Sequence, residues 1–158
     1  MELFTSPSKG KMSLKEVVMD ILDYVCEDTS YSYKLIVGSD SHPYENETCF
    51  VSAIIIHRIG KGARYYYHKQ NQKRINSLSQ RIFTEAALSL DLADRLSTSL
   101  KENGQEDMPV EIHLDVGTHG ATRELVKEVI GMVVGSGFDA RIKPDASGAS
   151  KVADRYTK

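Results

Sequence analysis

The order of the segments that favour strands and helices limits this chain to few folds. Strand-forming residues fill three successive runs, at 33–39, 48–59 and 63–68. The links between these runs are too short for a helical crossover, and Gly60-Lys61-Gly62 permits a tight hairpin. The three strands are therefore expected to be antiparallel neighbours.

Beyond this meander, helices and strands alternate. The patterns indicate a helix at 77–103, a strand at 110–116, a helix at 121–134, a strand at 138–143 and a last helix that begins at 144–145. Strands separated by helices pair in parallel through right-handed crossovers. The order β-β-β-α-β-α-β-α predicts an α/β domain with a mixed five-stranded sheet and helices on its faces. Strands four and five are expected to run parallel to strand one.

An extra helix is expected before the first strand, over 13–27. Ser13 and Glu16 have the spacing of a capping box, and apolar residues follow them at helical period. The chain has 158 residues, of which 41% are hydrophobic, and this is enough for one sizeable core. We therefore expect a single domain over 1–158.

The chain shows no feature of a membrane or secreted protein. No run approaches the roughly 20 apolar residues that span a bilayer, and the N-terminal stretch MELFTSPSKGK lacks the apolar part of a signal peptide. Cys26 and Cys49 stand apart without a CxxC pair, which argues against a zinc site or a disulfide framework. A cytoplasmic location is expected.

Two acids are expected at the carboxyl ends of neighbouring strands. Asp40 ends strand one, and Asp115 lies near the end of strand four, on the same face as Glu111 and His113. Two carboxylates about 4 Å apart repel by roughly 4 kcal/mol at an effective dielectric of 20, so such a pair needs a proton or a cation. The alternative is that each Asp caps a loop or the following helix.

Further acids and histidines could join this pair. Glu85 lies three residues after Ile82, on or beside the apolar stripe of its helix, although an edge position with the carboxylate in water is the alternative. Asp145 follows strand five and could instead be an N-cap. The histidines that could move a proton or contact a phosphate, unless they are structural or solvated, are His42, His113 and His119.

A nucleic-acid partner would require a local basic patch, because the net charge is -2. The segment 68–74, HKQNQKR, reads as a basic loop, and its Lys69, Lys73 and Arg74 could track a phosphate backbone. Lys143, beside Asp145, could contact a phosphate as well. Tyr65, Tyr66 and Tyr67 could stack on bases, or they could alternate into the core beside a solvated loop.

The acids and several sequence stretches together resemble a known family. The stretches are VGSDSH, SLSQRIFTEAALSLDLA, IHLDVGTHG, GMVVGSGFDARIKPDASGAS and VADRYTK. They look like the YkuK-like bacterial family of predicted ribonuclease H-like proteins, and the likeness covers nearly the whole chain.

The resemblance implies a cluster of catalytic, metal-binding acids. It assigns this role to Asp40, Glu85 and Asp115, with Asp145 or Asp154 as the fourth; Asp145 is preferred because it directly follows strand five. It also implies Mg²⁺ or Mn²⁺, since two such ions about 3.5 to 4 Å apart can activate water and stabilise a leaving oxygen. The implied activity is hydrolysis of phosphodiester bonds in RNA or DNA.

Two other functions compete with a nuclease. A catalytically inactive module that binds nucleic acid or protein would use the acids structurally, and the slightly acidic charge favours it. Alternatively, residues 115–118 and the next helix could form a phosphate loop like that of actin-like ATPases. The chain is too short for the two lobes of such an ATPase, so this reading would require a dimer.

Overall fold

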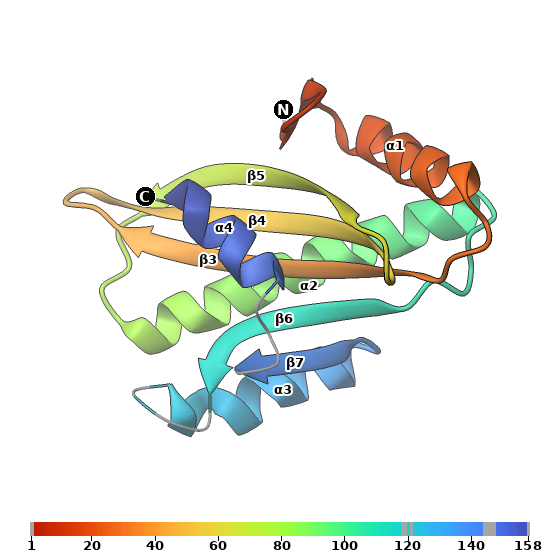
Figure 1. The fold of residues 1–158 in the computed structure, drawn as a ribbon. Helices are drawn as coiled ribbons and strands as arrows, with labels where there is room; N and C mark the ends of the chain where they lie inside the picture. Colours follow the sequence, from red (N-terminus) through yellow and green to blue (C-terminus); the bar gives the residue numbers. More distant parts are fainter. Residues whose placement is uncertain (1, 118–119, 121, 144–147, 158) are drawn as a thin grey trace.

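The protein folds around one seven-stranded sheet with the strand order β2-β1-β5-β4-β3-β6-β7 (Figure 1). The computed structural model describes the chain except for residues 1, 118–119, 121, 144–147 and 158 and the side chains of 148–151 and 154. The strands are β1 (Phe4–Ser6), β2 (Gly10–Met12), β3 (Tyr33–Pro43), β4 (Glu47–Arg58), β5 (Ala63–Lys73), β6 (Val110–Gly117) and β7 (Asp139–Lys143). The helices are α1 (Leu14–Glu27), α2 (Leu78–Glu102), the short 3₁₀ turn η1 (Arg123–Leu125), α3 (Val126–Gly135) and α4 (Gly148–Thr157).

The pairing of the central strands confirms the predicted meander and parallel crossovers. β4 is antiparallel to both β3 and β5, whereas β6 runs parallel to β3 and β7 parallel to β6. The prediction of five strands was wrong, because the hairpin of β1 and β2 extends the sheet beyond β5. Each of these two strands has three residues, which is too short to show the alternation that identifies a strand.

Two strands are longer than their sequences indicated. β3 continues to Pro43, so Asp40 lies inside the strand and not at its end. β5 continues to Lys73, so most of the expected basic loop at 68–74 is strand. The cause is cross-strand hydrogen bonding to β4, which pairs with β5 from His57 to Glu47 and overrides the polar composition of this segment.

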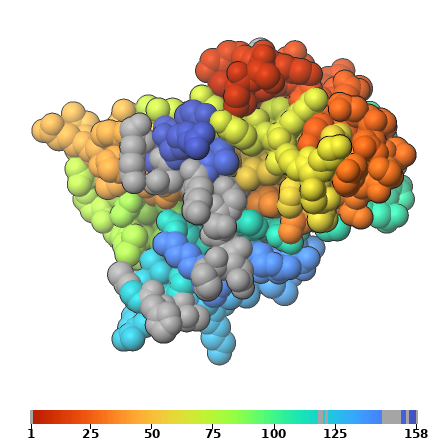
Figure 2. Space-filling view, viewed as in Figure 1, coloured from red at the N-terminus to blue at the C-terminus, as the bar shows by residue number. Residues whose placement is uncertain are grey.

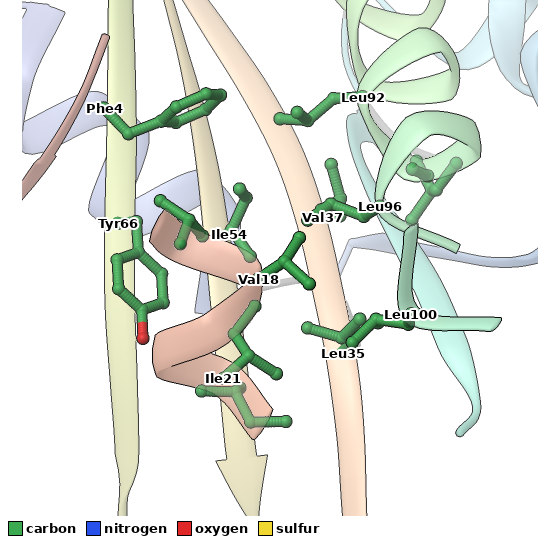
Figure 3. Close-up of a cluster of buried hydrophobic side chains, with 14 of the residues drawn as sticks. Phe4, Val18, Ile21, Leu35, Val37, Ile54, Tyr66, Leu92, Leu96 and Leu100 are labelled. Carbon is green, nitrogen blue, oxygen red and sulfur yellow. The ribbon is translucent and has the colours of Figure 1, made fainter. Parts of the chain in front are cut away.

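The helices divide between the two faces of the sheet. α1, α2 and α3 pack against one face, and α4 lies across β3 and β4 on the other (Figure 1). In the larger core, Leu96 of α2 and Val18 of α1 point toward Val37 of β3 (Figure 3). The smaller cluster joins Ala153 of α4 to alternate residues of the sheet, namely Ile36, Cys49, Val51, Ala53 and Ile55. Both faces of the central strands are therefore buried.

The helix ends follow their sequence signals in two of three cases. Ser13 and Glu16 form the predicted capping box of α1. α2 ends at Glu102, with Asn103 as its C-cap and Gly104, whose φ is +90°, directly after it. The helix expected at 121–134 begins later, as η1 and then α3. Thr122 precedes this turn, and its hydroxyl accepts a hydrogen bond from the Gly117 backbone N–H at 3.1 Å, which holds the segment against the end of β6.

Within the described ranges, no helix has the length and apolar character required to span a bilayer. Figure 2 shows α4 seated on the sheet, with the hairpin between β3 and β4 projecting beyond it.

Candidate metal centre

The candidate site lies where β3 and β6 separate. Their parallel pairing ends at Gly38↔His113, and β6 then curves away from β3 (Figure 1). Asp40 and Asp115 each lie two residues beyond this last pair, on the same side of their strands. The separation of the strands gives Glu85, on α2, access to both carboxylates.

Three carboxyl groups meet at this point. One oxygen atom from each of Asp40, Glu85 and Asp115 lies within 4.8 Å of the other two. Asp40 is 8% exposed and Glu85 7% exposed, whereas the side chain of Asp115 is 30% exposed. The predicted convergence of these three acids is confirmed, and the site is open to solvent on the Asp115 side.

Glu85 is held in place by the strand that carries Asp40. Its Oε2 accepts a hydrogen bond from the Ser41 hydroxyl at 2.5 Å. One helical turn later, the Ser89 hydroxyl lies 2.8 Å from the Ser39 hydroxyl, which also bonds to Ser52 of β4. These contacts fix α2 along β3, so Glu85 is an inward-facing acid and not the solvated edge residue of the alternative interpretation.

The environment of Glu85 favours its protonated form. Burial raises the pKa of Glu85 to about 8, and the charges of Asp40 and Asp115 act in the same direction. The hydrogen bond from Ser41 and the charge of Arg81 oppose this shift. A cation between the three groups would favour the ionised carboxylate.

Lys143 is the basic residue in direct contact with the cluster. Its ammonium nitrogen lies 2.7 Å from Oδ1 of Asp115, and the side chain is 58% exposed. The hydrogen bond to Asp115 raises the pKa of Lys143, and the charges of Asp40 and Glu85 add to this effect. The predicted phosphate-contacting residue is thus at the site, on its open side.

Of the two candidates for the fourth acid, Asp145 and Asp154, the structure describes only the backbone of the second. Asp145 lies outside the described residues. Asp154 belongs to α4, although its side chain is not among those described. α4 is fixed over β3 and β4 by the fully buried Ala153 and by the Tyr44 hydroxyl, which donates to the Thr157 carbonyl. The helix therefore covers the same face of the sheet as Asp40.

The other predicted nucleic-acid contacts lie farther across the sheet. Lys69 is opposite Val51, which is itself opposite Asp40, and Lys73 is opposite Glu47. Arg74 donates hydrogen bonds to the Tyr44 carbonyl at 2.8 Å and to Asn76 Oδ1 at 2.7 Å. Arg74 therefore stabilises the hairpin between β3 and β4.

The three tyrosines of β5 alternate between the core and the α4 side of the sheet. Tyr66 is buried in the larger core, whereas Tyr67 stacks on Tyr156 of α4 with ring centroids 3.8 Å apart. The Tyr65 hydroxyl lies 2.9 Å from the Tyr156 hydroxyl. Tyr156 of α4 therefore occupies the ring faces of this outward-facing pair that stacking on bases would use.

The histidines are not equivalent. His113 is buried, and its Nε2 lies 3.2 Å from Oε1 of Glu111. Burial lowers the pKa of His113, which favours the neutral form of the side chain. His42 packs edge-on against Tyr44, with centroids 4.7 Å apart. His119 lies outside the described residues.

Sequence reasoning missed two residues of the site. Arg81 lies four residues before Glu85 on α2, and this spacing of opposite charges was a signal that could have been used. Ser41 follows Asp40, and strand alternation directs it to the opposite face of β3. Its contact with Glu85 depends on how α2 is placed along β3, which no local pattern shows.

Comparison with known proteins identifies the family of the chain. A family model described as "Ribonuclease H-like" matches residues 16–158. The chain belongs to the ribonuclease H-like family. The match begins in α1, so β1 and β2 lie outside the part that this family shares.

A bacterial relative narrows the family further. The "Uncharacterized protein YkuK" of Bacillus subtilis (strain 168) is 34% identical over 169 aligned positions, which cover 99% of this chain and 97% of the relative. This supports a YkuK-like group within the ribonuclease H-like family. No solved structure gives a significant match.

Proposed function

We propose that this protein is a divalent-metal-dependent nuclease that hydrolyses phosphodiester bonds of RNA or DNA. The observation that carries the proposal is the meeting of Asp40, Glu85 and Asp115 where β3 and β6 separate, in a member of the ribonuclease H-like family. The fold alone hosts many functions, so the argument depends on this cluster.

The residues fit a hard divalent ion such as Mg²⁺ or Mn²⁺. Carboxylate oxygens are the ligands that these ions prefer. The pKa of Glu85 is raised mainly by burial and further by the charges of Asp40 and Asp115, and a cation would offset these charges. Asp40, Glu85 and Asp115 would hold the metal, with Asp145 or Asp154 as a fourth ligand. When bound, such ions supply an activated water and stabilise the leaving oxygen of the phosphodiester.

Residues of the chain itself would control the access of water and bind the substrate phosphates. Because Asp40 and Glu85 are buried, bulk water can reach the cluster only from the side of Asp115. On the open side, Lys143 can move from Asp115 to a substrate phosphate, because its side chain is mostly exposed. Lys69 and Lys73 are candidates for contacts to the backbone of a bound strand, with Arg74 at the adjacent hairpin.

The proposal is tested by metal binding and cleavage in the same samples. Wild type, Asp40→Asn/Asp115→Asn and the control Asp94→Asn, which removes an exposed acid of α2, are titrated with Mn²⁺ by calorimetry. They are then incubated with labelled RNA, DNA and hybrid duplexes. We expect binding and cleavage in wild type and control, and neither in the double variant.

Two other results would change the conclusion. If wild type binds no Mn²⁺ at millimolar concentration, the protein is not a metal-dependent nuclease. If Mn²⁺ binds and raises the melting temperature but no substrate is cut, the result favours a binding module with this fold. The near balance of Lys and Arg against Asp and Glu, 20 against 22, is the observation that favours such a module.

The fourth acid gives a separate prediction. We expect Asp145→Asn to weaken Mn²⁺ affinity by about tenfold, or about 1.4 kcal/mol, and Asp154→Asn to weaken it less, because Asp145 follows the last strand of the sheet. Calorimetry on both variants measures this. A larger loss in Asp154→Asn would assign the fourth position to α4.

A further inference from the structure

The buried contact between Ser41 and Glu85 has a role that the acidic cluster does not by itself explain. The Ser41 hydroxyl donates to Glu85 Oε2 at 2.5 Å, and both side chains are buried. The two residues are 44 positions apart in sequence and come from β3 and α2. The bond therefore links the strand that carries Asp40 to the helix that carries the opposing acid.

A second bond runs parallel to the first. Ser39 and Ser41 are two residues apart on β3, about 6.6 Å along a strand, and their partners Ser89 and Glu85 are four residues apart on α2, about 6 Å along a helix. The nearly equal spacings let both bonds form at once. Together they set the position of α2 along β3.

Ser39 and Ser41 form hydrogen bonds with different kinds of group. Ser39 bonds to two hydroxyl groups, those of Ser52 and Ser89, and so contributes to the packing of α2 on the sheet. Ser41 bonds to the carboxyl group itself. A hydroxyl that donates to one carboxyl oxygen restricts the torsions of the glutamate and leaves its other acceptor sites available.

We propose that Ser41 is a positioning residue that orients the Glu85 carboxyl group for binding a divalent ion. The inference rests on the proposed function, since it concerns the same cluster. Partners of this kind, which contact a ligand and not the metal, typically change metal affinity by 10- to 100-fold when they are removed. Ser41 carries no charge, so it orients Glu85 without competing with the ion.

The test compares Mn²⁺ affinity with fold stability in four full-length proteins. Wild type, Ser41→Ala, Ser41→Thr and the matched control Ser39→Ala are titrated by calorimetry, and their melting temperatures are measured in EDTA. We expect Ser41→Ala to weaken Mn²⁺ binding at least about tenfold, and Ser41→Thr to recover most of the affinity. Ser39→Ala should lower the melting temperature but leave the affinity within about twofold of wild type.

The outcomes separate this inference from the function on which it rests. If wild type binds Mn²⁺ and Ser41→Ala binds it equally well, the positioning role is wrong and the metal centre stands. If Ser39→Ala weakens binding as much as Ser41→Ala, the effect belongs to helix packing and the role is also wrong. If wild type itself does not bind, both proposals fail. Should Ser41→Ala not fold, Ser41→Cys, which keeps the shape with a weak donor, should show the same loss of affinity.

Discussion

In EDTA, the free energy of unfolding of the wild-type protein should fall as pH rises from about 5 to 8, and Glu85→Gln should remove most of this dependence. Burial and the charges of Asp40 and Asp115 raise the pKa of Glu85 from 4.5 to about 8. Between these values the native state holds a proton that the unfolded state has released, so stability is fully present below 4.5 and is lost as pH rises through 8. The expected size is on the order of a few kcal/mol.

Chemical denaturation at several pH values measures this effect. Glu85→Gln keeps the size of the side chain and an acceptor for Ser41 but cannot ionise, so it should be at least as stable as wild type near pH 8. Saturating Mn²⁺ should flatten the wild-type profile, because the ion favours the ionised carboxylate. Equal slopes for wild type and Glu85→Gln in EDTA would show that the pKa of Glu85 is not raised.

Replacing Asp20, which is not part of the metal centre, with alanine should destabilise the protein by about 2 kcal/mol. Asp20 is buried on α1, and its carboxylate accepts hydrogen bonds from Tyr66 of β5 and from Lys9 and Arg64. Burial acts to raise the pKa of Asp20, but the hydrogen bonds from Lys9 and Tyr66 outweigh it and lower the pKa. Removing the carboxylate leaves the buried Tyr66 hydroxyl without its acceptor, which typically costs about 1–3 kcal/mol, and the partly exposed Lys9 and Arg64 add little to this.

The measurement is urea denaturation of Asp20→Ala beside Asp23→Ala, which removes an exposed acid of the same helix. The control should change stability by less than about 1 kcal/mol. Because the pKa of Asp20 is lowered, its stabilisation is present above the ordinary pKa of an aspartate and is lost as pH falls through the native value. The difference in free energy of unfolding between Asp20→Ala and Asp23→Ala should therefore become smaller at acid pH. A small difference that does not change with pH would show that the hydrogen bonds of Asp20 do not stabilise the protein.

The central part of the fold could be predicted because local patterns and connection lengths agree. Short links require the β3 to β5 meander, and helices between the later strands require parallel pairing. These rules also bring Asp40 and Asp115 to one place. The alternation of β6, which buries Ile112, Leu114 and Val116 in the larger core, directs Asp115 to the other face as expected.

Features that depend on contacts distant in sequence could not be predicted. In the hairpin of β1 and β2, β1 pairs with β5 through Thr5↔Tyr67, and Lys9 in the turn bonds to Asp20 of α1. The position of this hairpin is therefore set by its contacts with β5 and α1 and not by its own composition. The contact of Ser41 with Glu85 depends in the same way on the placement of α2 along β3. The extension of β5 beyond residue 68 could not be predicted, because it is pairing with β4 that stabilises this polar segment as a strand.

The N-terminal hairpin leaves part of the sheet edge open, and two lysines lie along this open part. Among the described residues, β1 meets β5 at Thr5↔Tyr67, so the backbone of β5 beyond this point has no strand on its outer side. Open edges of this length can recruit strands from other molecules, and charged side chains discourage such association. Lys69 and Lys73 lie on this exposed stretch, where lysines are the side chains that discourage edge-to-edge pairing whether or not the protein binds nucleic acid.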